Sequence, residues 1–143
     1  MPTIRRTVVA AKPVGTVFTY LADFAHAEEW DAGTVSCRQL SGDGGVGTTY
    51  ENVSSFRGRK TTLVYEVREL VPDQRLVLRG ENKTVTAVDT MTFHPAPEGT
   101  RVTYTAEFTF KGLAALLTPF LKGSLDKLGD EAQASMAAAL ARL

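Results

Sequence analysis

The chain ends in the stretch GLAALLTPFLKGSLDKLGDEAQASMAAALARL, which runs from Gly112 to Leu143. Apolar residues recur along it at helical spacing, at Leu113, Leu116, Leu117, Phe120, Leu121, Leu125, Leu128, Ala132, Met136, Leu140 and Leu143. This spacing predicts a helical segment, and Pro119 is expected to break it, with Thr118 as the cap of the main helix. The part after Pro119 spans on the order of 35 Å as a helix, so it needs a broad apolar surface to lie on.

The residues before this stretch are typical of strands, apart from a helical region near the N-terminus. Thr3 to Ala10 predicts a strand, Pro13 stands where a short amphipathic helix begins, and Asp23 to Asp31 predicts a second helical turn. A strand is expected from Val35 to Leu40, and further strands follow one another up to Phe110. The order predicts an α+β fold in which the last helix packs on an antiparallel sheet.

Four expected hairpin loops predict how these strands pair. The loops are Arg57-Gly58, Val71-Pro72-Asp73-Gln74 as a type I turn, Asn82-Lys83, and the segment from His94 to Arg101. They place Tyr50 opposite Tyr65, Asn52 opposite Leu63, Ser54 opposite Thr61, Val67 opposite Leu78, Glu69 opposite Leu76, Leu78 opposite Ala87, Leu76 opposite Asp89, Met91 opposite Tyr104, Asp89 opposite Ala106, and Ala87 opposite Phe108. All four registers agree on which residues share a face, and a slip of one residue would reverse the faces.

These registers separate an apolar face from a polar one. The inward face collects Tyr50, Leu63, Tyr65, Val67, Leu76, Leu78, Val85, Ala87, Met91, Phe93, Val102, Tyr104, Phe108 and Phe110. The outward face collects Thr49, Glu51, Glu66, Arg68, Arg79, Thr86, Thr90, Thr92, Arg101, Thr103 and Thr105. Such a division is typical of an antiparallel sheet that is covered on one side. A β-bulge would shift the pattern beyond it, and a strongly curved sheet would leave a space under the helix.

The composition indicates a folded domain without charge bias. The 143 residues are expected to form one domain, 1–143, because 43% hydrophobic and 22% charged residues are ordinary for such a domain. The 16 basic and 16 acidic residues cancel, which argues against nucleic acid as a partner. No apolar run approaches the roughly 18 residues of a membrane helix, so stable membrane insertion is not expected. The one cysteine, Cys37, cannot form an internal disulfide, which favours a reducing, cytoplasmic location.

Several short motifs resemble the START-like or helix-grip superfamily (SRPBCC), and within it the polyketide cyclase/dehydrase-like branch. They are Val17-Phe18-Thr19-Tyr20-Leu21-Ala22-Asp23, Glu29-Trp30-Asp31, Val46-Gly47-Thr48-Thr49-Tyr50, Leu63-Val64-Tyr65-Glu66-Val67, Arg75-Leu76-Val77-Leu78-Arg79-Gly80, Thr90-Met91-Thr92-Phe93 and Gly99-Thr100-Arg101-Val102-Thr103-Tyr104. The resemblance covers essentially the whole chain. It implies a curved seven-stranded antiparallel sheet wrapped around the long C-terminal helix, two short helices after the first strand, and a ligand cavity between sheet and helix. It does not imply one reaction, because the superfamily includes carriers, cyclases, hydrolases and proteins of no known activity.

Asp89 is the sharpest chemical signal, because it is the one acid among the apolar inward residues of its strand. A buried carboxylate must be paired, protonated or hydrated. It is therefore a structural carboxylate bonded to a neighbour such as Tyr104, a polar group of a wet pocket, or a weak candidate for a catalytic acid or base. Glu69 falls in the same row and would complete a pair of carboxylates, although its place beside a turn favours a solvated side chain.

Polar tips on the inward face favour a cavity for an oxygenated hydrophobic molecule. They are supplied by Tyr50, Tyr65, Tyr104, Asn52 and Ser54. As an alternative, the tyrosines are ordinary core residues. Trp30 either lines the mouth of the pocket or anchors its connector. The full set of candidate ligand-binding residues is Trp30, Tyr50, Asn52, Tyr65, Leu78, Asp89, Met91, Tyr104, Phe108, Leu117, Phe120 and Leu121.

We therefore expect the chain to bind a small hydrophobic, partly oxygenated molecule, as a carrier, sequestering protein or sensor. The alternative is a polyketide cyclase/aromatase-type enzyme that uses the same cavity and moves protons through Asp89 and a tyrosine. A second alternative is an interaction or stress-related domain with a filled core. No cofactor and no metal are expected, because His26 and His94 lie far apart and no ligand spacing is present. Both a monomer and a homodimer remain compatible with the sequence.

Overall fold

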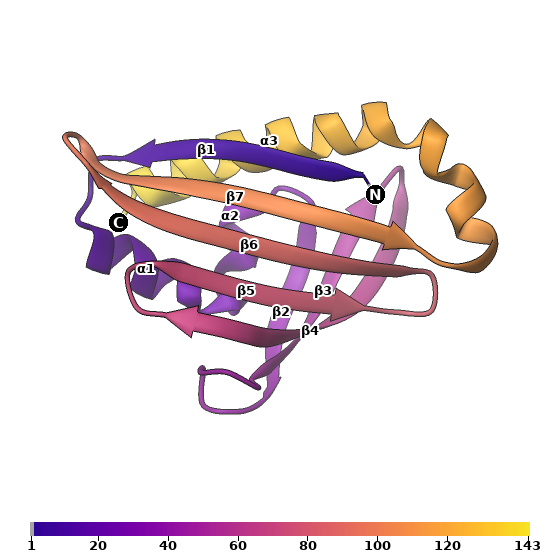
Figure 1. The fold of residues 1–143 in the computed structure, drawn as a ribbon, viewed down its shortest axis with the longest axis horizontal. Helices are drawn as coiled ribbons and strands as arrows, with labels where there is room; N and C mark the ends of the chain where they lie inside the picture. Colours follow the sequence, from indigo (N-terminus) through magenta and orange to yellow (C-terminus); the bar gives the residue numbers. More distant parts are fainter. Residues whose placement is uncertain (1) are drawn as a thin grey trace.

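The sheet has seven strands, all paired antiparallel, in a computed structural model that describes residues 2–143 (Figure 1). The elements are β1 (Thr3–Ala10), α1 (Val14–Ala22), η1 (Phe24–His26), α2 (Ala27–Trp30), β2 (Thr34–Ser41), β3 (Thr49–Phe56), β4 (Arg59–Val71), β5 (Arg75–Glu81), β6 (Val85–Ala96), β7 (Gly99–Phe110), η2 (Gly112–Phe120) and α3 (Lys122–Ala141). The expected strands and the helical region between the first two are therefore confirmed.

The order of strands in the sheet is β1-β7-β6-β5-β4-β3-β2, so the first strand returns to pair with the last. Figure 1 shows β2 and β3 running at a steep angle to β6 and β7, which gives the sheet its curvature, and α3 running beside β1. The helix α3 contacts β1 and α2, while α1 contacts β6 and β7. The inner side of the sheet is thus covered by α3 along one part and by the α1–α2 region along another.

Two of the four hairpins have the predicted register throughout. In the β3–β4 hairpin Tyr50 lies opposite Tyr65, and Phe56 and Arg59 close the two-residue loop. In the β6–β7 hairpin Met91 lies opposite Tyr104. Both loops were identified from glycine- and proline-rich turns between strands of clear alternation, where local chemistry decides the pairing.

The β5–β6 hairpin is shifted by two residues from the prediction. Leu78 lies opposite Asp89, whereas the prediction placed it opposite Ala87. The cause lies at Asn82, whose side-chain oxygen accepts the backbone N–H groups of Thr84 (2.8 Å) and Val85 (2.9 Å). This side chain begins the turn, so the loop falls one residue later than expected. Because a shift of two preserves the alternation, the inward and outward faces stay as predicted.

The β4–β5 hairpin contains a β-bulge between Val67 and Glu69. Val67 lies opposite Leu78 as predicted, but Glu69 lies opposite Val77, not Leu76. The loop is also not a type I turn, because Asp73 has a φ of 63° where that turn requires about −90°. The extra residue moves Glu69 to the outer face, where it bonds to Arg75 at 3.1 Å and is half exposed. The prediction that Glu69 lies in the same row as Asp89 on the inward face is therefore wrong.

The C-terminal segment is helical with a break, as predicted, but its two parts behave differently. The helix α3 buries Leu125, Gly129, Ala132, Met136, Ala139 and Leu140 at helical spacing. The 3₁₀ segment η2 buries none of its residues, and Leu117 and Phe120 are 53% and 76% exposed. Pro119 lies inside η2, and α3 begins at Lys122 without a side-chain cap, so the expected role of Thr118 as a cap is wrong.

The helix α3 approaches β1 closely because Gly129 lies between them. A Cβ atom at this position would lie 2.5 Å from the Cγ2 atom of Ile4. Among the helices of residues 2–143, none combines the length and the hydropathy that a membrane span requires.

Candidate functional site

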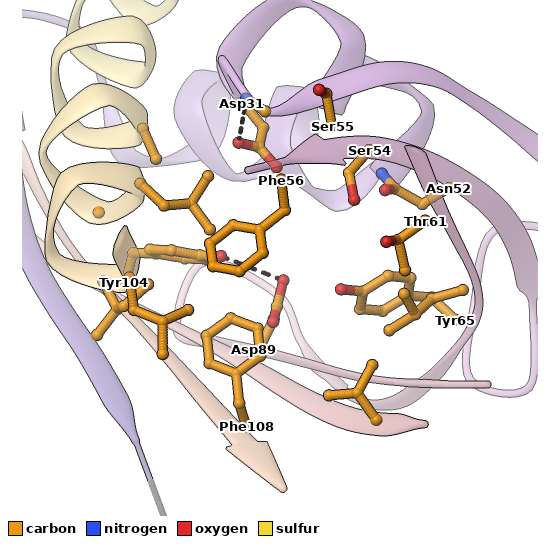
Figure 2. A pocket seen from close by; sticks show the side chains of 18 of the residues that line it. Asp31, Asn52, Ser54, Ser55, Phe56, Thr61, Tyr65, Asp89, Tyr104 and Phe108 are labelled. Atoms are coloured by element: carbon orange, nitrogen blue, oxygen red, sulfur yellow. Dashed lines mark hydrogen bonds between the residues drawn. The ribbon is translucent and has the colours of Figure 1, made fainter. Parts of the chain in front are cut away.

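A cavity of about 170 Å³ lies between the sheet and α3 (Figure 2). Strands β1, β3, β4, β6 and β7, helix α3 and the connector after α2 contribute to its wall. The lining residues are Ile4, Asp31, Gly33, Asn52, Ser54, Ser55, Phe56, Thr61, Leu63, Tyr65, Thr84, Val85, Asp89, Tyr104, Phe108, Phe110, Leu125, Leu128, Gly129 and Ala132. The surface of the wall is therefore apolar for the most part, although nearly half of the lining residues carry a polar group.

Asp89 enters this cavity from the middle of β6. It is 4% exposed, and the Tyr104 hydroxyl donates a hydrogen bond to its Oδ2 atom at 3.3 Å. The pKa of Asp89 is raised to about 7, chiefly by burial and to a lesser extent by the charge of Asp31, while the hydrogen bond from Tyr104 acts in the opposite direction. The predicted hydrogen bond with Tyr104 is therefore confirmed. Asp89 can therefore gain or lose a proton near neutral pH.

Asp31 is a second acid of the cavity, and the sequence did not single it out as a site residue. Figure 2 shows it across the cavity from Asp89. The Gly33 backbone N–H and the Thr34 hydroxyl donate to its two carboxylate oxygens at 3.1 and 3.0 Å, as in an Asx turn. These bonds lower its pKa, but burial has the larger effect and raises it. The Asp-x-Gly-Thr pattern predicts the turn, whereas the direction in which the turn faces depends on the tertiary fold.

The three tyrosines of the inward face have different roles. Tyr65 is 8% exposed, and its hydroxyl points into the cavity and makes no hydrogen bond to any of the residues 2–143 (Figure 2). Tyr104 is bonded to Asp89. Tyr50 is buried outside the cavity wall, where its hydroxyl bonds to the backbone of Phe24 and its ring packs on that of Phe24 at 5.7 Å. Burial raises the pKa of all three phenols, so they are neutral hydrogen-bonding groups at physiological pH.

Asn52 connects the cavity to a line of polar groups. Its side-chain amide donates to the Thr34 hydroxyl at 3.1 Å, and Thr34 in turn donates to Asp31. On its other side, Asn52 bonds to the thiol of Cys37. Burial raises the pKa of Cys37 to about 11, so the thiol stays protonated and is not activated as a nucleophile.

The cavity brings together five of the residues predicted to bind ligand: Asn52, Tyr65, Asp89, Tyr104 and Phe108. Trp30, Tyr50, Leu78, Met91 and Leu121 are buried in the core away from its wall. The prediction that Leu117 and Phe120 supply apolar contact is wrong, because both are largely exposed in η2. Their place is taken by Leu125, Leu128 and Ala132 of α3, which belong to the same apolar stripe.

Other lining residues escaped prediction although a signal was present. Thr61 has the same alternation as Leu63 in the predicted hairpin and lines the cavity opposite Ser54, which was predicted as a polar tip of the inward face. Phe56 follows the same alternation at the end of β3. Within residues 2–143 no group of three or more His, Cys, Asp or Glu side chains is placed to hold a metal ion.

The family described as "Polyketide cyclase / dehydrase and lipid transport" matches residues 1–142. Solved structures with the same fold include TTHA0849 from Thermus thermophilus, with a TM-score of 0.82, 17% identity and 97% of each chain covered. A START superfamily protein from Mycobacterium smegmatis has a TM-score of 0.80 and 12% identity over 96% of each chain.

The Zhui aromatase/cyclase from Streptomyces sp. R1128 has a TM-score of 0.77 and 15% identity, over 96% of this chain and 90% of that one. No curated protein matches the chain. At these identities the structures show a shared fold, whereas the family match extends over nearly the whole sequence. The chain therefore belongs to the polyketide cyclase/dehydrase and lipid transport family and has its START-like helix-grip fold.

Proposed function

We propose that the chain binds a small, largely apolar and partly oxygenated molecule in the cavity between the sheet and α3. The observation that carries this proposal is the Tyr65 hydroxyl, which points inward beside the buried Asp89 and has no hydrogen-bond partner within residues 2–143, in a cavity whose surface is largely apolar. Polar groups that converge in an apolar cavity are typical of a small-molecule site. The role is that of a carrier, sequestering protein or sensor, and the free thiol of Cys37 supports a reducing, cytoplasmic setting.

The size of the cavity limits the ligand. An apolar cavity of roughly 150 Å³ accommodates a benzene molecule, and this one measures about 170 Å³. A ligand of one ring with a short polar arm therefore fits without rearrangement of the core. Leu63, Val85 and Leu125 would contact its apolar body, while Asp89 and Tyr65 would orient its polar end.

A cavity-filling variant tests this proposal. Ala132 lines the cavity from α3, so Ala132→Leu places three more carbon atoms inside it. Ala138 lies on the exposed side of the same helix, and Ala138→Leu is the matched control. The probes are 2-phenylethylamine, 2-phenylethanol and phenylacetate, which have one ring and similar size but differ in charge.

We expect at least one probe to bind the unaltered protein and Ala138→Leu, measured by ligand-detected NMR titration. Ala132→Leu should weaken that binding by about tenfold or more, because overfilling a packed site costs about 1–3 kcal/mol. If no probe binds, or if Ala132→Leu binds as well as its control, the cavity is not the binding site. Native mass spectrometry of the purified protein would in addition detect a small molecule that co-purifies with it.

A second candidate function is a cyclase/aromatase-type reaction in the same cavity. The observation that favours it is the pKa of about 7 at Asp89, since a general acid or base works best when its pKa lies near the operating pH. In that role Asp89 would exchange a proton with the substrate, and Tyr104 would hold the carboxylate in place. Turnover of a poly-β-keto thioester that falls at least a hundredfold in Asp89→Asn, with a rate profile that bends near pH 7, would support the enzyme over the carrier.

A further inference from the structure

The charged residues on the cavity wall are all acidic. Asp31 and Asp89 line it, and no Lys, Arg or His side chain from residues 2–143 does so. The two acids lie on opposite sides of the space in Figure 2, and the charge of Asp31 raises the pKa of Asp89. Two acids that share a low-dielectric space repel each other when both are ionised, and a cation bound between them would offset this repulsion.

Within residues 2–143, the elements around the two acids supply no counter-ion to the cavity. The titratable groups that face them are the phenols of Tyr65 on β4 and Tyr104 on β7, and the thiol of Cys37 on β2, all of them neutral. Helix α3 contributes Leu125, Leu128, Gly129 and Ala132 to the wall, and β1 contributes Ile4. Arg6 of β1 is already bonded to the carboxylate of Asp130 and to the backbone carbonyl of Asp126, and it does not line the cavity.

Hydrogen-bond acceptors in the cavity are left without donors. Asp89 is more than nine-tenths buried and accepts one hydrogen bond from residues 2–143, that of Tyr104, at a long 3.3 Å. Its other oxygen and the hydroxyl of Tyr65 have no partner within the same residues and face the cavity. A group with several N–H donors would satisfy both, and a primary ammonium group carries three.

Aromatic rings form much of the remaining wall. Those of Phe56, Tyr65, Tyr104, Phe108 and Phe110 border the cavity. The face of an aromatic ring attracts an organic ammonium group, and the attraction is stronger where water is excluded. Acidic groups and aromatic faces together favour a cation and disfavour a carboxylate or a phosphate, which the two acids would repel.

We propose, building on the binding function above, that the ligand carries a protonated amine next to a small apolar body, with the ammonium group between Asp31 and Asp89. The phenol of Tyr65 accepts one of its hydrogen bonds, and the aromatic rings surround the carbon atoms beside the nitrogen. The substrate class is thus a small organic amine, and a neutral or anionic oxygenated molecule of the same size is the less favoured occupant.

The affinities of the three one-ring probes for the unaltered protein test this directly. At pH 8 we expect 2-phenylethylamine to bind at least about tenfold more tightly than 2-phenylethanol, since a charge-assisted hydrogen bond exceeds a neutral one. Phenylacetate should bind most weakly of the three. The affinity of the amine should rise between pH 5.5 and 8 as Asp89 ionises, while that of the alcohol should not rise. All values come from isothermal titration calorimetry or ligand-detected NMR.

Two variants at the acids and one control locate the effect. Asp89→Asn keeps the shape but removes the charge, so the amine should lose about tenfold or more in affinity and most of its dependence on pH. Asp31→Asn should also lower the affinity for the amine. Glu69→Gln changes an acid on the outer face, where it bonds to Arg75, and should leave every affinity unchanged.

The possible outcomes distinguish a failure of this inference from a failure of the binding function on which it rests. If 2-phenylethanol or phenylacetate binds as tightly as the amine, the amine is not the ligand class, and the cavity remains a binding site. If the amine binds best but keeps its affinity in both Asp31→Asn and Asp89→Asn, the acids do not hold it and the inference is overturned. If no probe binds at all, both proposals are overturned together.

Discussion

Two neighbouring inward positions of β6, Met91 and Asp89, lie in differently built halves of the interior. Met91 is fully buried in a filled half, together with Trp30, Tyr50 and Leu78. Asp89, two residues earlier on the same face, borders the hollow half with Tyr65 and Tyr104. Both positions obey the alternation of the strand. The alternation therefore tells which side chains point inward, but not whether the space above them is filled.

What covers each half explains the difference. The α1–α2 region brings large rings onto the filled half, where Phe18 packs edge-on against Phe93 at 5.0 Å and Phe24 lies 6.3 Å from Trp30. The hollow half is covered by α3, which presents Gly129 and Ala132 there. Small residues allow the helix to approach β1 closely but leave the space next to Asp89 empty. The cavity thus results from side-chain size on the covering helix.

The largest difference between the halves should follow from removing an aromatic ring. Trp30→Ala is expected to lower the free energy of unfolding by about 3–5 kcal/mol, because it opens a cavity in a fully packed region. Phe108→Ala in the hollow half should lower it by about 1–2 kcal/mol, because this ring is half-buried and already borders a void. Urea denaturation followed by circular dichroism measures both. Equal losses would show that the two halves are packed alike.

A milder change at Trp30 refines this comparison. The indole N–H of Trp30 is buried and has no hydrogen-bond partner within residues 2–143. Trp30→Phe keeps most of the packed ring and removes this unpaired group, so it should lower stability by less than half as much as Trp30→Ala. A loss as large as that of the alanine variant would mean that the N–H has a partner, for example a bound water.

The second largest effect should come from the charge of Asp89. The pKa of Asp89 is about 7 in the folded chain, whereas an unperturbed aspartate has a pKa of 3.8. The folded state therefore holds the proton more tightly than the unfolded state. The contribution of Asp89 to stability is therefore largest below about pH 4 and is lost as the pH rises through 7, by on the order of 4 kcal/mol. Asp89→Asn removes this loss but leaves amide groups partly unpaired, so we expect a net gain of about 2–3 kcal/mol at pH 8.

At pH 4 this gain should disappear and leave only the cost of the partly unpaired amide, because Asp89 of the folded protein is then protonated and its charge no longer opposes folding. The measurement is the free energy of unfolding of both proteins from pH 4 to pH 8. Part of the slope should remain in the variant, since burial also raises the pKa of Asp31. A variant that is less stable than the unaltered protein at pH 8 would show that Asp89 has a structural role, as its bond to Tyr104 alone would suggest.

The smallest effect should distinguish hydroxyl groups in the two halves. Thr100 lies fully buried beside α1 and donates to the Lys12 backbone carbonyl at 2.7 Å, so Thr100→Val should cost about 1 kcal/mol or more. Thr61 lines the cavity, and its hydroxyl has no hydrogen bond to the residues 2–143. Thr61→Val should change stability by less than about 0.5 kcal/mol. Thermal unfolding of both variants against the unaltered protein checks the difference.

The sequence predicts the faces of the sheet well, because alternation along a strand is a local property. It also predicts the β3–β4 and β6–β7 registers, where the loop residues limit the choice. It fails at the bulge beside Arg68, because an extra residue in one strand leaves no mark in the pattern. The β5–β6 loop shows the same limit, because a loop at Asn82-Lys83 and a loop one residue later are both compatible with the flanking strands. The hydrogen bonds of the Asn82 side chain decide between them.

The candidate site is less accessible to sequence because it depends on contacts between distant elements. Asp89 stands out as an acid among apolar residues of one strand, whereas Asp31 lies in a connector whose orientation no local pattern fixes. The segment η2 shows the limit of composition. Its leucines have the periodicity of buried residues, yet Leu113 and Leu116 are 85% and 70% exposed. Periodicity indicates that an element has an apolar side, but not that another element covers it.

The pairing of β1 with β7 has a consequence for how the chain folds during synthesis. Thr3 lies opposite Glu107, so the first strand leaves the ribosome about a hundred residues before its partner exists. Closing so long a loop costs entropy before the contacts form, which predicts slow folding for a chain of this length. Until α3 also emerges, the inner face of the sheet is exposed and prone to aggregation. A nascent chain stalled before Lys122 is therefore expected to depend on chaperones.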